Sequence, residues 1–227
     1  MKFIILTLFL EMFQGPFDFS ILKRARDKGI FSIDFVNIRD FSVDKYKSVD
    51  DHPYGGGKGM IMRVDIIDKA LTSVKKTISP EEKTATILLD PRGKPFTQKI
   101  SKQLSGYDTL IFLCGHYEGI DERIRSLVDI TISLGDFVVT GGEIPTMAII
   151  DSVARLLPGV LPSDEVTEKE SFTNDLLEYP QYTRPQEFKG LSIPRVLLSG
   201  NHKAIEAWRK EQEQELTKTH RPDLIRP

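Results

Sequence analysis

Cysteine and histidine are scarce in this sequence, and their scarcity excludes several classes of protein. One cysteine, Cys114, occurs among the 227 residues, which leaves no pair for a disulfide framework or for a cysteine-based structural zinc site. The four histidines are scattered, so no metal site is expected from them. Apolar runs all fall short of the roughly 20 residues that a membrane-spanning helix needs.

Common motifs of nucleotide binding and hydrolysis are also missing. The sequence has no GxGxxG after an expected strand, no GxxxxGKS/T, no HExxH, no CxxC and no GxSxG. Dinucleotide, P-loop, metalloenzyme and simple hydrolase functions therefore lose support.

Charge of neither sign dominates the chain. Its 31 Lys and Arg residues against 33 Asp and Glu give a net charge of −2, which argues against a protein that coats nucleic acid over its whole surface. Residues 184–227 carry nine basic and six acidic side chains, a local net of +3. This part of the chain is the expected place to meet phosphate groups.

The N-terminal segment resembles an export signal but lacks the cleavage site of one. The apolar run Phe3 to Leu10 stops at Glu11, and no small-residue cleavage site follows. We expect a buried strand there instead, and a cytoplasmic protein.

Apolar runs of strand length alternate with helical patterns over residues 1–158, which predicts an α/β domain with a mostly parallel sheet. The expected strands are 3–8, 31–38, 84–89, 109–113, 130–133 and 137–140. The expected helices are 16–28, 64–76, 98–104, 122–127 and 144–157. Residues 159–178 lack an apolar period and predict a flexible linker or lid. Residues 179–227 predict a small, mainly helical domain, with Asn201 as the N-cap of its helix.

Glycine gathers in three clusters, at 54–60, 114–119 and 134–143. The second follows an expected strand and the third opens a helix, which is where ligands bind in open α/β sheets. Glycine there lets the backbone approach a flat ligand closely. Tight-turn chemistry explains any single cluster equally well.

Six collinear strings together resemble a known family: VDDHPYGGGKGM (49–60), CGHYEGIDER (114–123), LGDFVVTGGEIP (134–145), IDSVARLLPGV (150–160), YTRP (182–185) and VLLSGNH (196–202). They are similar to bacterial tRNA (guanine-N1)-methyltransferases of the TrmD type, which belong to the SPOUT class. The resemblance implies an α/β fold with a C-terminal trefoil knot, bound S-adenosylmethionine, a homodimer with shared active sites, and assistance by magnesium. The implied substrate is tRNA, methylated at N1 of the guanosine immediately 3′ of the anticodon.

The resemblance also assigns residues to the cofactor pocket, most of them in the glycine-rich loops. They are Leu88, Leu89, Asp90, Pro91, Gly115, Tyr117, Glu118, Leu134, Gly135, Asp136, Phe137, Val138, Val139, Gly141, Gly142 and Pro145. From the residues alone, Asp90-Pro91 also suits a turn after a strand, and Glu118 suits an acid at a helix start.

Two catalytic residues follow from the same resemblance. Arg155 matches an arginine expected to stabilise charge on guanine O6, although Asp151 at i−4 also suits an ordinary ion pair. Glu170 stands where familiar members carry the aspartate that acts as general base, and glutamate is longer by one C–C bond, about 1.5 Å. Glu168 and Asp175 are rival candidates for the base.

Lys58, Arg184, Lys203, Arg209 and Lys210 are candidates for RNA contact, although charged surface residues are often only solvated. Trp208 is expected in the core. Two other functions stay open from the residues: a SPOUT methyltransferase that acts at another RNA position, and a non-catalytic RNA-binding α/β protein.

Overall fold

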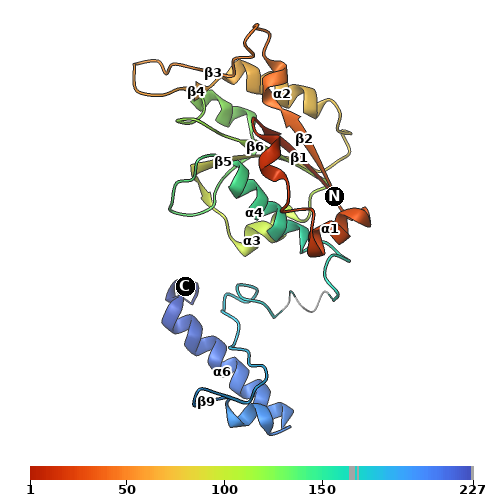
Figure 1. Cartoon of the computed structure of the whole chain (residues 1–227), viewed down its shortest axis with the longest axis vertical. Helices are drawn as coiled ribbons and strands as arrows, with labels where there is room; N and C mark the ends of the chain where they lie inside the picture. Colours follow the sequence, from red (N-terminus) through yellow and green to blue (C-terminus); the bar gives the residue numbers. More distant parts are fainter. Residues whose placement is uncertain (164–166, 168, 226–227) are drawn as a thin grey trace. The chain divides into compact units, whose positions relative to one another are not determined.

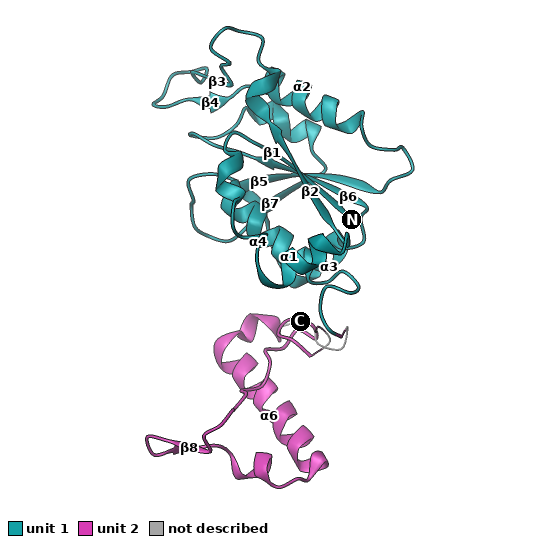
Figure 2. Ribbon diagram, turned by 45° about the vertical axis from the view of Figure 1, so that its right-hand side comes forward, with its two compact units in different colours: residues 1–162 teal, residues 163–227 magenta. Residues whose placement is uncertain are grey.

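The computed structural model describes residues 1–163, 167 and 169–225. The chain divides into two compact units, Met1–Pro162 and Ser163–Pro227 (Figure 2). Each unit is described by itself below.

Unit 1 is built on a five-stranded, fully parallel sheet in the order β2-β1-β6-β5-β7. The strands are β1 (Lys2–Thr7), β2 (Ser32–Asn37), β5 (Thr84–Pro95), β6 (Thr109–Cys114) and β7 (Ile130–Ser133). All six residues of β6 are buried because helices cover both faces of the sheet, which explains its continuous apolar sequence. The predicted α/β domain with a parallel central sheet is confirmed.

Helices cover the two faces unequally. Side chains at alternate positions of β1 enter different cores: Phe3 and Ile5 pack with α1, α3 and α4, whereas Ile4 and Leu6 pack with α2 (Figure 1). The helices are α1 (Ser20–Asp27), α2 (Val64–Lys75), α3 (Gln98–Leu104) and α4 (Glu143–Ala154), with short 3-10 turns η1 (Leu10–Phe13), η2 (Ile38–Phe41) and η3 (Glu122–Leu127). Two-residue strands β3 (Asp50–Asp51) and β4 (Ile61–Met62) pair antiparallel beside α2.

One predicted strand is wrong. Residues 137–140 form a loop rather than a strand, beginning with a tight turn in which Phe137 N donates to Gly135 O at 2.9 Å. Phe137 and Val138 are exposed, at 56% and 85%. Their apolar character, which suggested a buried strand, belongs instead to the rim of a cavity described below.

The strand β5 is interrupted where it pairs with β7. Both Leu89 and Lys94 pair with Ile132, so residues 90–93 form an excursion, or bulge, within β5 that has no partner in β7. A Cβ at Gly93 would lie 2.6 Å from backbone atoms of Ile132. Glycine is therefore required there by the closeness of two backbones.

Unit 2 centres on the long helix α6 (His202–His220), which Asn201 caps as predicted by accepting a hydrogen bond from Ala204 N at 3.2 Å. Leu177 N donates to Thr217 Oγ1 at 2.8 Å, which ties the segment before it to α6. Trp208 is half-buried and lies 6.4 Å from the ring of Tyr182. The remaining elements are β8 (Glu187–Phe188), β9 (Leu191–Ser192), η4 (Arg195–Leu198) and η5 (Pro222–Leu224).

Among the helices of the described residues, none has both the length and the apolar character to span a membrane.

We predict that Gly93→Ala lowers the free energy of unfolding by about 1–3 kcal/mol, because the added methyl forces β5 and β7 apart. Gly106→Ala is the matched control, since its Cβ meets only ordinary contacts at 3.5 Å and beyond. Urea unfolding followed by circular dichroism measures both variants. Equal stability of the two would contradict the close approach at Gly93.

Candidate active site

A cavity of about 160 Å³ in unit 1 is enclosed by the bulged part of β5 and by the segments at the carboxyl ends of β6 and β7. They contribute residues 89–91, 115–120, 132–134 and 137–142, and Pro145 of α4 completes the wall. The second and third glycine clusters of the sequence therefore meet at one site. The first cluster adjoins the second, because Glu118 N donates to Met60 O at 3.1 Å.

Most residues that the resemblance assigned to the cofactor lie in this wall: Leu89, Asp90, Pro91, Gly115, Tyr117, Glu118, Leu134, Phe137, Val138, Val139, Gly141, Gly142 and Pro145. Leu88 instead faces the core that packs on α2. Gly135 and Asp136 lie in the third loop but outside the lining. Residues of the wall that sequence reasoning missed are His116, Gly119, Ile120, Ile132, Ser133 and Thr140. Of these, His116, Gly119, Ile120 and Thr140 stand inside the glycine-rich strings, and that position was the available signal.

The base of the cavity is a contact between two backbone segments. Gly142 N donates to Gly115 O at 2.8 Å. A Cβ at Gly142 would lie 2.6 Å from Cys114 Cα and 2.9 Å from Gly115 N. Because no side chain fits between them, glycine is needed here for close approach, at an ordinary negative φ.

Tyr117 occupies a strained position in the wall. Its φ is +60°, a left-handed conformation that non-glycine residues adopt at a cost of about 1–3 kcal/mol. Arg39 Nη2 donates to the Tyr117 hydroxyl at 3.2 Å, which holds the half-exposed ring. Strain retained at a cavity wall is typical of a binding site.

A fully buried carboxylate lies behind the same wall. Glu143 begins α4 and accepts a hydrogen bond from Thr7 Oγ1 at 2.8 Å. Its Oε2 lies 4.0 Å from His116 Nδ1, and neither atom has a hydrogen-bond partner among the described residues. The helix N-terminus stabilises the negative charge. The imidazole of His116 packs on Phe9, with ring centroids 4.6 Å apart.

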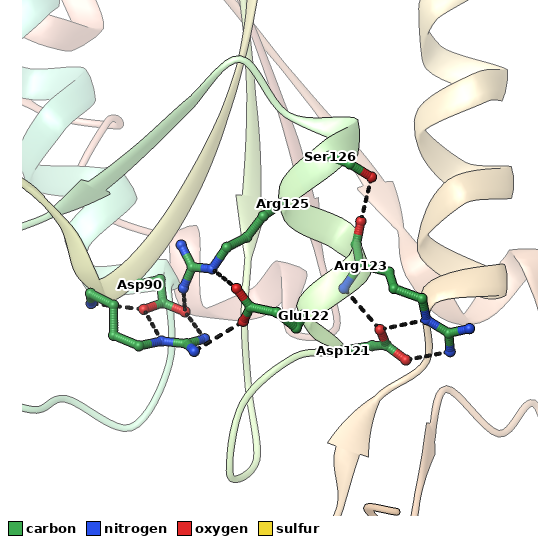
Figure 3. A network of polar contacts seen from close by, with 7 residues as sticks. Asp90, Asp121, Glu122, Arg123, Arg125 and Ser126 are labelled. Carbon is green, nitrogen blue, oxygen red and sulfur yellow. Dashed lines mark hydrogen bonds and ion pairs between the residues drawn. The ribbon is translucent and has the colours of Figure 1, made fainter.

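Asp90 is held by arginines on two sides (Figure 3). Its Oδ2 accepts a hydrogen bond from Arg92 Nη2 at 3.0 Å and forms an ion pair with Arg125 Nη2 at 2.9 Å. Glu122 of η3 pairs with both arginines, at 3.0 and 2.8 Å. Burial alone would raise the pKa of Asp90, but the hydrogen bonds from Arg92 and the charges of Arg92 and Arg125 outweigh it and hold that pKa below its usual value.

Arg155 lies at the end of α4 that is remote from the cavity. Its N donates to Asp151 O at 3.2 Å, and its side chain is half-buried. It stands ten positions after Pro145 of the cavity wall, which is about 15 Å along the helix axis. This distance exceeds the reach of an arginine side chain, so Arg155 does not line the cavity of its own chain.

Glu170 lies in unit 2, in a segment of turns packed against α6. Its O accepts from Thr173 N at 3.2 Å. It borders a hollow of about 180 Å³ that Lys169, Arg209 and Lys210 also line. The rival base Asp175 is exposed, and Glu168 lies outside the described residues.

The candidate RNA-binding residues fall on both units. Lys58 is exposed in the glycine loop of unit 1, and Arg184 and Lys203 are exposed in unit 2. Arg209 pairs with Glu206 at 2.6 Å and lies over the ring of Tyr179 at 4.8 Å. Its charge is therefore partly compensated, whereas Lys210 is exposed next to it.

The whole chain, residues 1–227, matches the sequence profile of the family described as tRNA (Guanine-1)-methyltransferase TrmD. The chain belongs to this family.

Similar proteins carry the same description. A tRNA (guanine-N(1)-)-methyltransferase of Carboxydothermus hydrogenoformans is 55% identical over all of this chain and 88% of its own length. Proteins of the same name from Dictyoglomus turgidum and Staphylococcus carnosus are 52% and 50% identical, over 97% and 99% of this chain and 88% and 91% of theirs. The six strings quoted above thus led to the correct family.

Metal ligands do not gather in the part of the chain that the structure describes. Within it, no group of three or more His, Cys, Asp or Glu side chains is arranged to hold a metal ion.

We predict that Cys114, at the closed end of the cavity, does not react with thiol reagents in the native protein. Its side chain is fully buried, and burial and the charge of Glu143 raise the pKa of the thiol despite a hydrogen bond with Thr146. Titration with Ellman's reagent at pH 8 should give no signal until guanidinium is added, and then one equivalent.

Ser192→Cys, at an exposed position of β9, is the control and should release one equivalent at once. Rapid labelling of the unmodified chain would show that the junction between β6 and α4 opens to solvent.

Proposed function

We propose that this chain transfers a methyl group from S-adenosylmethionine to N1 of a guanine in tRNA, at the guanosine immediately 3′ of the anticodon. The match of the entire chain to the family carries the proposal. The glycine-rich cavity at the carboxyl edge of the sheet supports it, because that edge is where cofactors bind in open α/β folds.

The cavity has the chemistry to hold this methyl donor. Apolar side chains such as Leu89, Ile132 and Val139 offer a surface for a flat adenine ring, and backbone groups of the glycine loops can hydrogen-bond its edge. The exposed carboxylate of Glu118 stands at the rim. When bound, the cofactor supplies an electrophilic methyl group.

We further propose that the chain is knotted around this cavity. Two contacts support a threaded path: the bulge of residues 90–93 opposite Ile132 of β7, and the backbone contact between Gly115 and Gly142. Both bring together segments that are far apart in the sequence. Knots are rare in proteins, so the family resemblance is what favours this path over a simple crossover.

Methylation at N1 requires that a proton leave N1 and that negative charge on guanine O6 be stabilised. Glu170 would accept the N1 proton, and the guanidinium of Arg155 would donate hydrogen bonds to O6. The N1 lone pair is then free to form the bond to carbon. Both tasks depend on where the two side chains are held and on their charges.

A second copy of the chain is part of this proposal. Because Arg155 lies about 15 Å along α4 from Pro145 of the cavity wall, it is too far to serve the cavity of its own chain. A homodimer in which each cavity receives Arg155 from the other protomer resolves the difficulty. Such a dimer also presents Lys58, Arg184, Lys203, Arg209 and Lys210 as the cations that contact the tRNA backbone.

We predict that Glu170→Gln lowers the rate of methyl transfer by about 10²-fold or more, because the amide cannot accept the N1 proton. The dissociation constant for S-adenosylmethionine should stay within about twofold. Single-turnover assays and calorimetry measure the two quantities.

Asp175→Asn, in the same segment, is the matched control and should retain the native rate. Glu170→Asp tests whether the length of this side chain affects proton removal, because familiar members of the family carry the shorter aspartate at this position. Near-normal turnover by Glu170→Gln, or its loss in Asp175→Asn, would assign the base elsewhere.

We predict that a tRNA transcript with guanosine immediately 3′ of the anticodon accepts one methyl group per molecule, and that the same transcript with adenosine there accepts none. Mapping by primer extension locates the modification. Methylation at another position would place the enzyme elsewhere on RNA, and absence of cofactor binding would indicate a non-catalytic RNA-binding protein.

A further inference from the structure

The wall of the cavity includes part of a stretch of β5 that has no pairing partner in β7. Residues 90–93 form this excursion, and both flanking residues, Leu89 and Lys94, pair with Ile132. Pro91 has no N–H, and Arg92 N donates to the side chain of Asp90, at 2.8 Å. Gly93 packs on the backbone of Ile132 at one end of the excursion, and side-chain contacts hold the other end.

Asp90 makes those contacts. Its side chain is 9% exposed, and both of its oxygens are occupied. Oδ1 accepts from Arg92 N and Nε at 2.8 and 3.1 Å. Oδ2 accepts from Arg92 Nη2 at 3.0 Å and forms an ion pair with Arg125 Nη2 at 2.9 Å. A carboxylate so enclosed keeps its charge because two guanidinium groups face it.

The two arginines differ in what they connect. Arg92 belongs to the excursion itself and is 60% exposed, so solvent weakens its pair with Glu122. Arg125 is 23% exposed and comes from η3, and it bridges Asp90 Oδ2 and Glu122 Oε1 (Figure 3). A guanidinium suits this task because its planar fork serves two carboxylates at once.

The element that carries Arg125 is firmly placed. Ile124 of η3 is fully buried in the core beneath α2. Asp121 caps η3 by accepting from Arg123 N at 3.0 Å, and Asp121 N donates to Met62 O at 3.0 Å. η3 also follows directly after the loop 115–120, which forms another part of the cavity wall. Arg125 thus joins two parts of the wall to one fixed point.

We propose that Arg125 is a positioning residue for the methyl donor. It is not among the described residues that line the cavity, and it acts by holding Asp90 and the excursion 90–93 at the rim. The inference rests on the proposed function, because it assumes that the cavity binds S-adenosylmethionine. It concerns affinity for the donor and leaves proton removal at guanine untouched.

Arg123 provides a matched control on the same 3-10 helix. It makes an equally close pair, with Nη2 2.6 Å and Nε 2.9 Å from the oxygens of Asp121. It is 69% exposed and points away from the excursion (Figure 3). Replacing Arg123 removes the same charge from the same element without releasing Asp90.

The test compares Arg125→Met and Arg123→Met in the full-length protein by calorimetry with S-adenosylmethionine and by steady-state kinetics. Partners that orient a ligand residue contribute roughly 10–100-fold to affinity at metal sites, and we expect the lower end here. Arg125→Met should raise Kd and KM for the donor about tenfold and change kcat at saturation by less than about threefold. Arg123→Met should change neither by more than twofold.

Arg125→Lys keeps the charge but cannot bridge two carboxylates, so it should fold and show an intermediate Kd. It also keeps the proposal testable if Arg125→Met fails to fold. Native affinity in Arg125→Lys, or equal loss in Arg123→Met, would overturn the inference. Failure of the unmodified protein to bind the donor would instead overturn the proposed function.

Discussion

The hydrogen bond from Gly142 N to Gly115 O is the contact on which the rest of the site depends. It joins the end of the buried strand β6 to the beginning of α4, at a separation where even one methyl group would collide with Cys114. The contact fixes where α4 starts. It thereby places Glu143 behind the cavity and Pro145 in its wall, and it fixes the direction in which the helix carries Arg155 away.

Two carboxylates near the cavity are stabilised in different ways. Glu143 is fully buried, with Thr7 as its hydrogen-bond donor and the N-terminus of α4 as its source of positive potential. Asp90 is at the rim, where arginines from two elements neutralise it. The buried contacts of Glu143 fix the base of the cavity. The position of the rim, in contrast, depends on the ion pairs of Asp90, which solvent can reach. The rim is therefore the part of the wall that a single side chain can reposition.

In the proposed reaction, the two units of the chain supply different functional groups. Unit 1 supplies the cavity and, at the far end of α4, the arginine. Unit 2 supplies Glu170 and most of the candidate RNA-binding cations around α6. Neither of the two cavities described above has both Arg155 and Glu170 at its wall, so the proposed function needs a second protomer and the tRNA to bring the two groups together. Under that proposal, methyl transfer would depend on binding of the correct RNA.

The sequence by itself determined the parallel sheet, the order of its elements and the family. Continuous apolar runs such as Thr109 to Leu113 need burial on both faces, and Asn201 had the side chain to cap α6. The sequence pattern wrongly predicted a strand at residues 137–140, because a sequence alone does not distinguish apolar residues that line a cavity from those of a buried strand. It also gave no sign of Arg125 or Glu143, whose partners Asp90 and Thr7 are 35 and 136 residues away. Only the tertiary structure decided these contacts, because packing of the sheet and helices brings such distant groups together.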